Sequence, residues 1–299
     1  MTTLTIARAT YSQTIRQPVY TVLLLAMLAT VSIHATLPYY TFGEDTKMYK
    51  DIGMAYVLGF VLVMALLSAS RVVADEIDDR TMLTLMSKPV RRTEVIIGKF
   101  LGLLLGCGLA IFLGCLAVAV AAWFMYPADE MEPIFPEDWR TLEIIRPVQW
   151  MHALSIVPGA VTIFLQVAIM TAISVAISTR LGAVLNVVIC AVLFVAGNLT
   201  GYLQQVVKDA GAGWRALARV LNTLLPGLYQ FNITDALAYR TVVFGPVPAD
   251  EETYFSSISW STIWTFVGLD ALYALCYITA AIALALALFR NRELTGSTA

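Results

Sequence analysis

Six long runs of apolar residues dominate the hydrophobic pattern of this chain. A membrane-spanning helix needs about 20 predominantly apolar residues. The runs that reach this length are Pro18–Pro38, Ile52–Val73, Leu101–Tyr126, His152–Ser178, Leu181–Leu203 and Ile263–Phe289. The pattern predicts an all-α integral membrane protein, with six transmembrane helices in a single transmembrane domain at residues 1–299. No small-residue cleavage site flanks the first run, so we interpret it as a retained span and not as a signal peptide.

The connections between these runs differ in charge. Most of the 19 lysines and arginines lie in residues 1–17, 71–100, 179–180 and 290–299, whereas residues 127–151 are rich in acids. Lysine and arginine accumulate in the cytoplasmic connections of membrane proteins. We therefore expect a multi-pass protein of the plasma membrane (the cytoplasmic membrane of a bacterium), with both termini and residues 71–100 in the cytoplasm.

Two stretches outside the spans have the pattern of helices that lie on a membrane surface. Before the first span, one helical face carries Leu4, Ala7, Tyr11 and Ile15, with Arg8, Ser12 and Arg16 beside it. This spacing predicts an interfacial helix on the inner leaflet; the alternative is a frayed tail. In the connection 204–262, an amphipathic helix is expected around Trp214, Leu217, Leu221 and Leu224. Pro226 and Gly227 end it, and a second short helix is expected from Asn232 or Thr234 to Tyr239, so that both cap the outer end of the bundle.

Composition agrees with a membrane protein and excludes several other classes. Apolar residues make up 59% of the 299 residues and charged residues only 13%, whereas soluble domains have about 25% charged residues. Mean hydropathy is +0.76. A net charge of −2 gives no indication of a nucleic-acid partner. The four cysteines fall within apolar runs without a C-x-x-C spacing, so we interpret them as packing residues and not as disulfides or metal ligands.

The motifs that nucleotide, metal and protease chemistry require are missing from the sequence. The chain has no G-x-x-x-x-G-K-[ST] phosphate-binding loop and no H-E-x-x-H motif. Its two histidines, His34 and His152, are fewer than the three or four ligands of a metal site. We therefore expect neither an enzyme nor a resident cofactor in this chain, and any energy source must lie in another subunit.

A dense group of charges separates the second and third runs. Acids come first and bases follow, in the order Asp75, Glu76, Asp78, Asp79, Arg80, Lys88, Arg91, Arg92 and Lys99. Proline breaks a helix and restricts the residue before it, so we expect one helix through about Met86, a turn at Ser87–Pro89, and a second helix that enters the third span. We call residues 75–92 the elbow. It is either a hydrated surface that a partner grips or a solvated loop that follows the charge rule.

The elbow carries motifs that resemble a known family. They are Glu76-x-x-x-Arg80-Thr81, Leu83-x-Leu85, Ser87-Lys88-Pro89-Val90-x-Arg92 and Gly98-Lys99, together with the closing residues 289–294, Phe-Arg-Asn-Arg-Glu-Leu. In these motifs the chain is similar to the ABC-2 type transporter permeases, the membrane subunits of type V-like ABC exporters. Many members have glycine where Arg80 stands. The six-span layout extends the likeness over the whole chain.

This resemblance implies a function and partners. In the family, the segment between the second and third spans is a coupling helix that sits in a cleft of a separate ABC ATP-binding subunit. ATP and Mg²⁺ would bind to that subunit and not to this chain. The resemblance further implies a second permease copy or paralogue, a surrounding of membrane lipid, a path lined by spans one, two and five, and export from the cytoplasm.

The same resemblance assigns roles within the elbow. Charged contacts would come from Asp75, Glu76, Asp78, Asp79 and Arg80, and apolar contacts from Met82, Leu85 and Met86. Thr81 and Arg92 belong to the same motif. Pro89 would fix the angle between the two arms, so that movement of the ATPase rotates the attached spans instead of unfolding the joint.

One acid and three amide residues lie within the predicted spans. Asp270 is the acid, and it either lies on the translocation path or is an interfacial acid that pairs with a neighbour. Gln166, Asn186 and Asn198 are either path residues or, as is usual for such amides, donors in hydrogen bonds between helices.

Two other functions remain open from the sequence. A membrane scaffold, through which an ATPase acts on an extracytoplasmic partner without transport, would use the acidic segment 127–151 for docking. An ion-coupled secondary transporter would need no ATP and would lose activity in Asp270→Asn. The scarcity of charge within the spans argues against the ion-coupled transporter.

Overall fold

The computed structural model describes a helical bundle. The described residues are 2–37, 45–78, 91–129, 149–206, 213–214, 225–234, 237, 241–243 and 257–290. The helices are α1 (Thr2–Ile15), α2 (Pro18–His34), α3 (Asp45–Asp78), α5 (Arg92–Asp129), α7 (Ile156–Ser178), α8 (Ala183–Val206), the 3₁₀ helix η3 (Leu228–Phe231) and α12 (Trp260–Arg290). Two short strands, β1 (Thr241–Val243) and β2 (Ser257–Ser259), pair in parallel. The sequence pattern predicted helices alone, so this strand pair is an addition to the all-α prediction.

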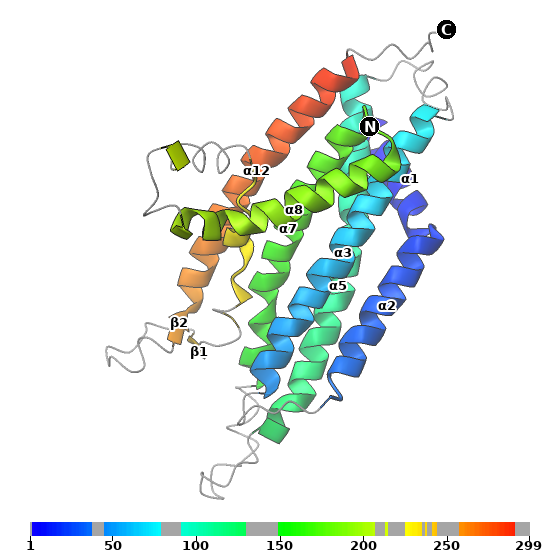
Figure 1. Cartoon of the computed structure of the whole chain (residues 1–299). Coiled ribbons are helices and arrows are strands. Elements are labelled where there is room, and N and C mark those ends of the chain that lie inside the picture. Colours follow the sequence, from blue (N-terminus) through cyan, green and yellow to red (C-terminus); the bar gives the residue numbers. More distant parts are fainter. Residues whose placement is uncertain are drawn as a thin grey trace, which may run out of the picture.

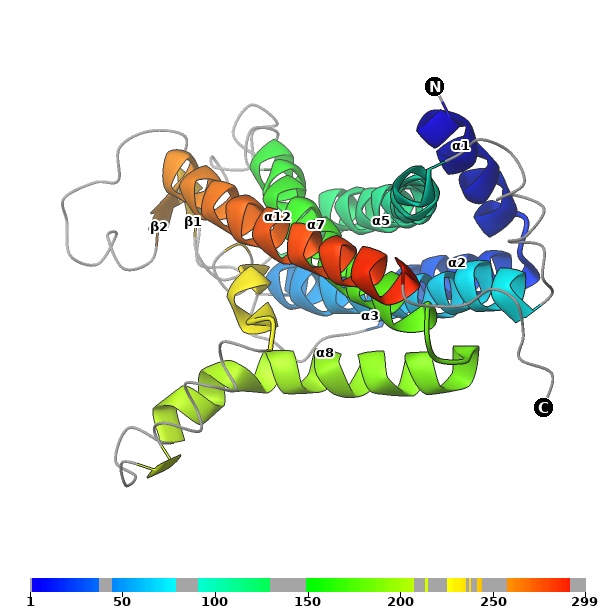
Figure 2. The same cartoon turned by 90° about the horizontal axis from the view of Figure 1, so that it is seen from above.

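Most of the long helices lie lengthwise in the bundle. Figure 1 places the N-terminus, the end of α3, the start of α5 and the end of α12 at one end of the molecule, and the strand pair toward the other end. The charge pattern predicted that these segments share one side of the membrane. Their described parts lie at the same end of the molecule. Helix α8 crosses the other helices at a steep angle, and the view from above shows it along one side of the bundle (Figure 2).

The predicted spans correspond to α2, α3, α5, α7, α8 and α12. Among the described residues, five helices are long and apolar enough to cross a membrane, and the count reaches six if α1 and α2, which are bent by 64°, form one broken span. Helix α3 begins at Asp45 instead of Ile52, because it continues through charged turns beyond the apolar run. Helix α5 begins at Arg92, as expected for the helix that follows the elbow and enters the third span.

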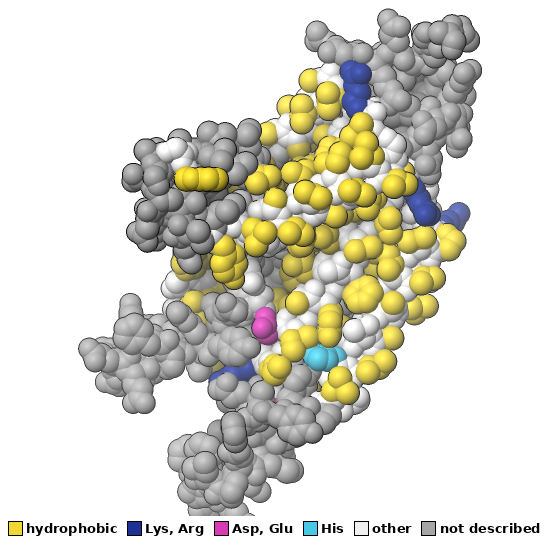
Figure 3. Space-filling model, viewed as in Figure 1, with side chains coloured by type: hydrophobic (Ala, Val, Ile, Leu, Met, Phe, Trp, Pro, Cys, Tyr) yellow, Lys and Arg dark blue, Asp and Glu magenta, His cyan; other side chains and the backbone are white. Residues whose placement is uncertain are grey.

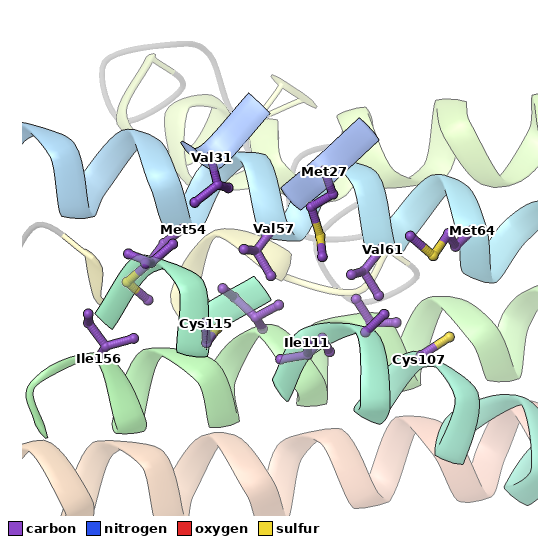
Figure 4. Packing of buried hydrophobic residues seen from close by; sticks show 14 of the residues in the cluster. Met27, Val31, Met54, Val57, Val61, Met64, Cys107, Ile111, Cys115 and Ile156 are labelled. Atoms are coloured by element: carbon purple, nitrogen blue, oxygen red, sulfur yellow. The ribbon is translucent and has the colours of Figure 1, made fainter. Parts of the chain in front are cut away.

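The largest apolar core joins four helices. Met27 and Val31 of α2, Val57 of α3 and Ile111 of α5 lie together in this core (Figure 4). Helix α7 contributes Ile156. The first, second, third and fourth predicted spans are therefore packed around one common interior.

The cysteines are packing residues, as their positions in the apolar runs indicated. Cys107 and Cys115 of α5 and Cys190 of α8 are buried inside the bundle. Cys276 is exposed on α12, and all four are free thiols. The buried three act as small apolar side chains in the packing of α5 and α8.

A row of three glycines brings α1 against α5. A Cβ atom added at Gly98 would lie 2.9 Å from Ile6 Cβ. One added at Gly102 would lie 2.6 Å from Thr10 Cβ, and Gly106 follows at the same spacing. Spacing by four residues places these glycines on one side of α5, so the two backbones approach closely, as small residues allow in membrane proteins. We call this contact the glycine seam.

The glycine seam identifies the side of the first helix that packs against protein. Its buried side consists of Ala7, Thr10 and Thr14, whereas Leu4 is 77% exposed. Of the predicted apolar stripe, only Ala7 is buried. The rest of the stripe is offset by one position from the buried residues, and one position is a rotation of about 100° on a helix of 3.6 residues per turn. It therefore lies beside the seam and not in it.

A segment of short helical turns and irregular backbone inserts between α7, α8 and α12. We call residues 225–234 and 237 the inserted segment. Leu228 and Phe231 of η3 are buried in one apolar cluster with residues of these three helices, and a Cβ atom at Gly197 of α8 would lie 2.6 Å from Pro226 O. Most of the amphipathic helices predicted within 204–262 lie outside the described residues. Of the residues that are described there, Trp214 is 65% exposed, whereas Thr234 and Leu237 are helical and Leu237 is buried.

The outer faces of α8 and α12 are apolar and exposed. Val184 is 80% exposed and Leu269 is 65% exposed, and apolar side chains are spread over much of the molecular face in Figure 3. A soluble protein rarely exposes apolar surface on this scale. The two faces are typical of helices surrounded by lipid.

Candidate functional site

The elbow lies between two long helices, and the structure describes its two ends. The backbone of Asp75, Glu76 and Asp78 forms the last turn of α3, and Arg92 is the first residue of α5. Residues 79–90 lie outside the described residues, and with them the predicted contacts Asp79, Arg80, Thr81, Met82, Leu85 and Pro89. The structure thus places the arms of the elbow, and the coupling roles of these residues stay predictions.

A buried lysine joins the two arms at their base. Lys99 of α5 is 3% exposed, and its Nζ donates to Val72 O of α3 at 2.9 Å. Removing an ammonium group from water is costly unless it is hydrogen-bonded, so the bond favours one separation of the arms. Val72 also packs against Val95 and Ile96 of α5 in an apolar cluster. A force applied to the elbow would therefore act on α3 and α5 together.

A buried polar network links α3 to α7 and α8. Asn186 Nδ2 donates to Ser70 Oγ of α3 and to Ser174 Oγ of α7, each at 2.9 Å. Cys190 Sγ donates to Asn186 Oδ1 at 3.3 Å. All four side chains are buried. Of the two interpretations of Asn186, the geometry supports a hydrogen bond between helices.

Replacing Asn186 with leucine is expected to destabilise the bundle by about 1–2 kcal/mol, because two interhelical hydrogen bonds are lost in an apolar environment. The measurement is the unfolding free energy in mixed micelles. Asn198→Leu is a matched control on the same helix, because Asn198 Nδ2 donates within α8, to Phe194 O at 2.9 Å. Equal stability losses in the two variants would contradict a linking role for Asn186.

The family of the chain is shown by comparison with known proteins. A model of the ABC-2 family transporter proteins matches residues 4–294. This chain belongs to that family. A search of curated proteins found no match.

The ABC-2 protein holds its inserted segment by three side chains from α7 and α12. Tyr277 OH donates to Leu225 O at 3.1 Å, and Gln166 Nε2 donates to Leu228 O at 3.4 Å. The backbone N–H of Gly227 donates to Tyr273 OH at 2.8 Å. Non-helical backbone within a membrane must find such partners inside the protein. Gln166 was predicted to be a path residue or to bond another helix, and the partner that it has is the backbone of this segment.

Asp270 lies on the packed side of α12 in this ABC-2 protein. Ile263, Val267 and Ala274 are buried at the same side of the helix, and Asp270 itself is partly buried. Both interpretations of this acid therefore stay open. Among the described residues, no group of three or more His, Cys, Asp or Glu side chains is placed to hold a metal ion.

Sequence reasoning missed two features of this ABC-2 protein. The first is the glycine seam, whose signal is the spacing Gly98-x-x-x-Gly102-x-x-x-Gly106; small residues four positions apart mark close helix contacts in membranes. The second is Lys50, which is 3% exposed in the first turns of α3. Its signal is weak, because a hydropathy window treats the charges of residues 45–51 as a solvated connection.

Proposed function

We propose that this chain is the permease subunit of an ABC exporter and that its elbow couples the membrane helices to a separate ATP-binding subunit. Family membership supports the role of a membrane transport component. The observation that carries the coupling role is the bond from Lys99 Nζ to Val72 O, which joins the two arms directly behind the elbow. A joint of this kind moves two spans together when the elbow is pushed.

The proposed mechanism uses two permease copies, identical or related, around a central path. Each copy binds one ATP-binding subunit, which supplies ATP and Mg²⁺. Closure of the two ATPase subunits displaces both elbows, and the arms α3 and α5 transmit this displacement into the bundle. The path is formed by spans one, two and five, here α2, α3 and α8, and the inserted segment acts as the lid on the side away from the elbow.

The sidedness of the elbow tests this proposal. A Ser87→Cys variant is expected to react with a membrane-impermeant maleimide only after cells are permeabilised, because the proposal places the elbow in the cytoplasm. Glu132→Cys, in the acidic segment that follows the far end of α5, is the control and should react in intact cells. The parent chain measures the background from its own cysteines. Labelling of Ser87→Cys in intact cells would remove the basis for coupling to a cytoplasmic ATPase.

A further inference from the structure

A buried lysine, near the end of α3 far from the elbow, contacts two other elements. Lys50 Nζ lies 3.1 Å from His152 Nδ1 and donates to Leu237 O at 3.3 Å. It also lies 3.5 Å from Ser155 Oγ, which in turn donates to His152 O at 2.8 Å. Leu237 belongs to the inserted segment, and its N–H donates to Ile233 O at 3.1 Å. One ammonium group therefore binds the residues just before α7 and the inserted segment at the same time.

One helical turn further along α3, the helices α3 and α7 and the inserted segment again pack against one another. A Cβ atom added at Gly159 of α7 would collide with Met54 Cε of α3 and would lie 3.2 Å from Leu237 Cδ1. Met54 follows Lys50 by four residues, so the two lie on one side of α3. Gly159 follows Ser155 at the same spacing. The contact has no room for a further methyl group, and Leu237 is itself 3% exposed.

Helix α3 connects this contact to the elbow without interruption. It runs for 34 residues from Asp45 to Asp78. At about 1.5 Å per residue, Lys50 and Asp75 lie roughly 40 Å apart on one helix. The ends of α3 thus carry the proposed input from the ATPase and the contact with the inserted segment.

We propose that Lys50 is a latch through which α3 holds the inserted segment closed and releases it when the elbow moves. This inference rests on the proposed function and adds to it the residue that links the elbow to the lid. A buried ammonium group is costly unless it is hydrogen-bonded, so the position of Lys50 depends on these partners. An apolar side chain would fill the same space, but it could not bind Leu237 O and His152 while α3 is in one position and release them in another.

Labelling of an introduced cysteine tests the latch. Thr234→Cys, on the inserted segment, is reacted with a water-soluble maleimide in the full-length protein in lipid nanodiscs, where both membrane sides are accessible. The chain without this substitution measures the background. Adding Lys50→Met is expected to raise the labelling rate about tenfold or more, since the loss of a hydrogen bond to a charged group shifts an equilibrium by at least that factor. Arg71→Met, at an exposed cation near the other end of the same helix, is the control and should leave the rate unchanged.

A second set of labelling measurements adds the ATP-binding subunit and ATP. ATP is expected to change the labelling rate in the parent Thr234→Cys protein but not when Lys50→Met is also present. The latch would be overturned if Lys50→Met left the labelling rate unchanged in the absence of nucleotide. It would also be overturned if ATP changed the labelling rate equally in the proteins with and without Lys50→Met. A protein that neither binds nor stimulates the ATPase in any variant would instead refute the proposed function. Gly159→Ala, which presses on Met54 and Leu237 at the same contact, should reproduce the raised rate if Lys50→Met fails to fold.

Discussion

Reversing the charges of Glu76 and Asp79 together is expected to abolish co-purification of the permease with its ATP-binding subunit or to uncouple ATP hydrolysis. Both acids belong to the elbow, and Glu76 lies in the last turn of α3. Losing one partner of a charge pair that is buried in an interface costs about 2–5 kcal/mol. Two such losses would weaken the complex by roughly a thousandfold or more.

The measurement combines affinity purification with ATPase activity in proteoliposomes. The matched control is Glu130→Lys with Glu132→Lys, which makes the same change in net charge in the acidic segment after α5. If the elbow variant keeps both its partner and its stimulation of ATP hydrolysis, the elbow is not the coupling surface. If the control loses them as well, net charge and not position is the cause.

The sequence located the long apolar helices well because their signal is length. A bilayer crossing requires about 20 apolar residues, and each predicted run lies within or overlaps a helix of the structure. Helix ends were predicted less well, since charged residues such as Asp45 continue a helix at little cost once it has left the lipid. The pattern therefore located the apolar part of each helix and not its full extent.

Packing between the helices was much less predictable, and the physical reason is the solvent. In lipid, an apolar side chain gains little by turning from the acyl chains toward another helix, so contacts are made where side chains are small. The first helix illustrates this: Leu4, in the predicted stripe, is 77% exposed, whereas Thr10 and Thr14 are buried against glycines. The apolar stripe was predicted to face the inner leaflet, and it gave no information on the side that packs against protein.

The polar residues of the spans were also only partly predictable from the sequence. Their types marked them as hydrogen-bonding groups, but the partner depended on the fold. Asn186 bonds two other helices, Gln166 bonds the backbone of the inserted segment, and Asn198 bonds its own helix. Lys50 received no role because its partners, Leu237 O and His152, come from distant parts of the sequence.

The glycine seam gives the other prediction with a large expected effect, Gly102→Leu. A Cβ atom at this position would lie 2.5 Å from Ala7 O and 2.6 Å from Thr10 Cβ, so the backbone of α1 itself must move. Overpacking of this kind costs about 1–3 kcal/mol and often more when backbone is displaced. Because α5 is an arm of the elbow, we expect separation of α1 from α5 to reduce ATPase stimulation as well as stability.

The experiment compares Gly102→Leu with Gly268→Leu in two measurements, the midpoint of thermal unfolding and the stimulation of the ATPase. Gly268, on α12, has nothing within 4 Å of an added Cβ atom and is exposed, so its replacement should be tolerated. Equal midpoints in the two variants would show that the close approach of α1 to α5 contributes little to stability. A lowered midpoint with full ATPase stimulation would show that α1 stabilises the bundle without taking part in the movement of the arm, because α5 would then transmit force with the seam open.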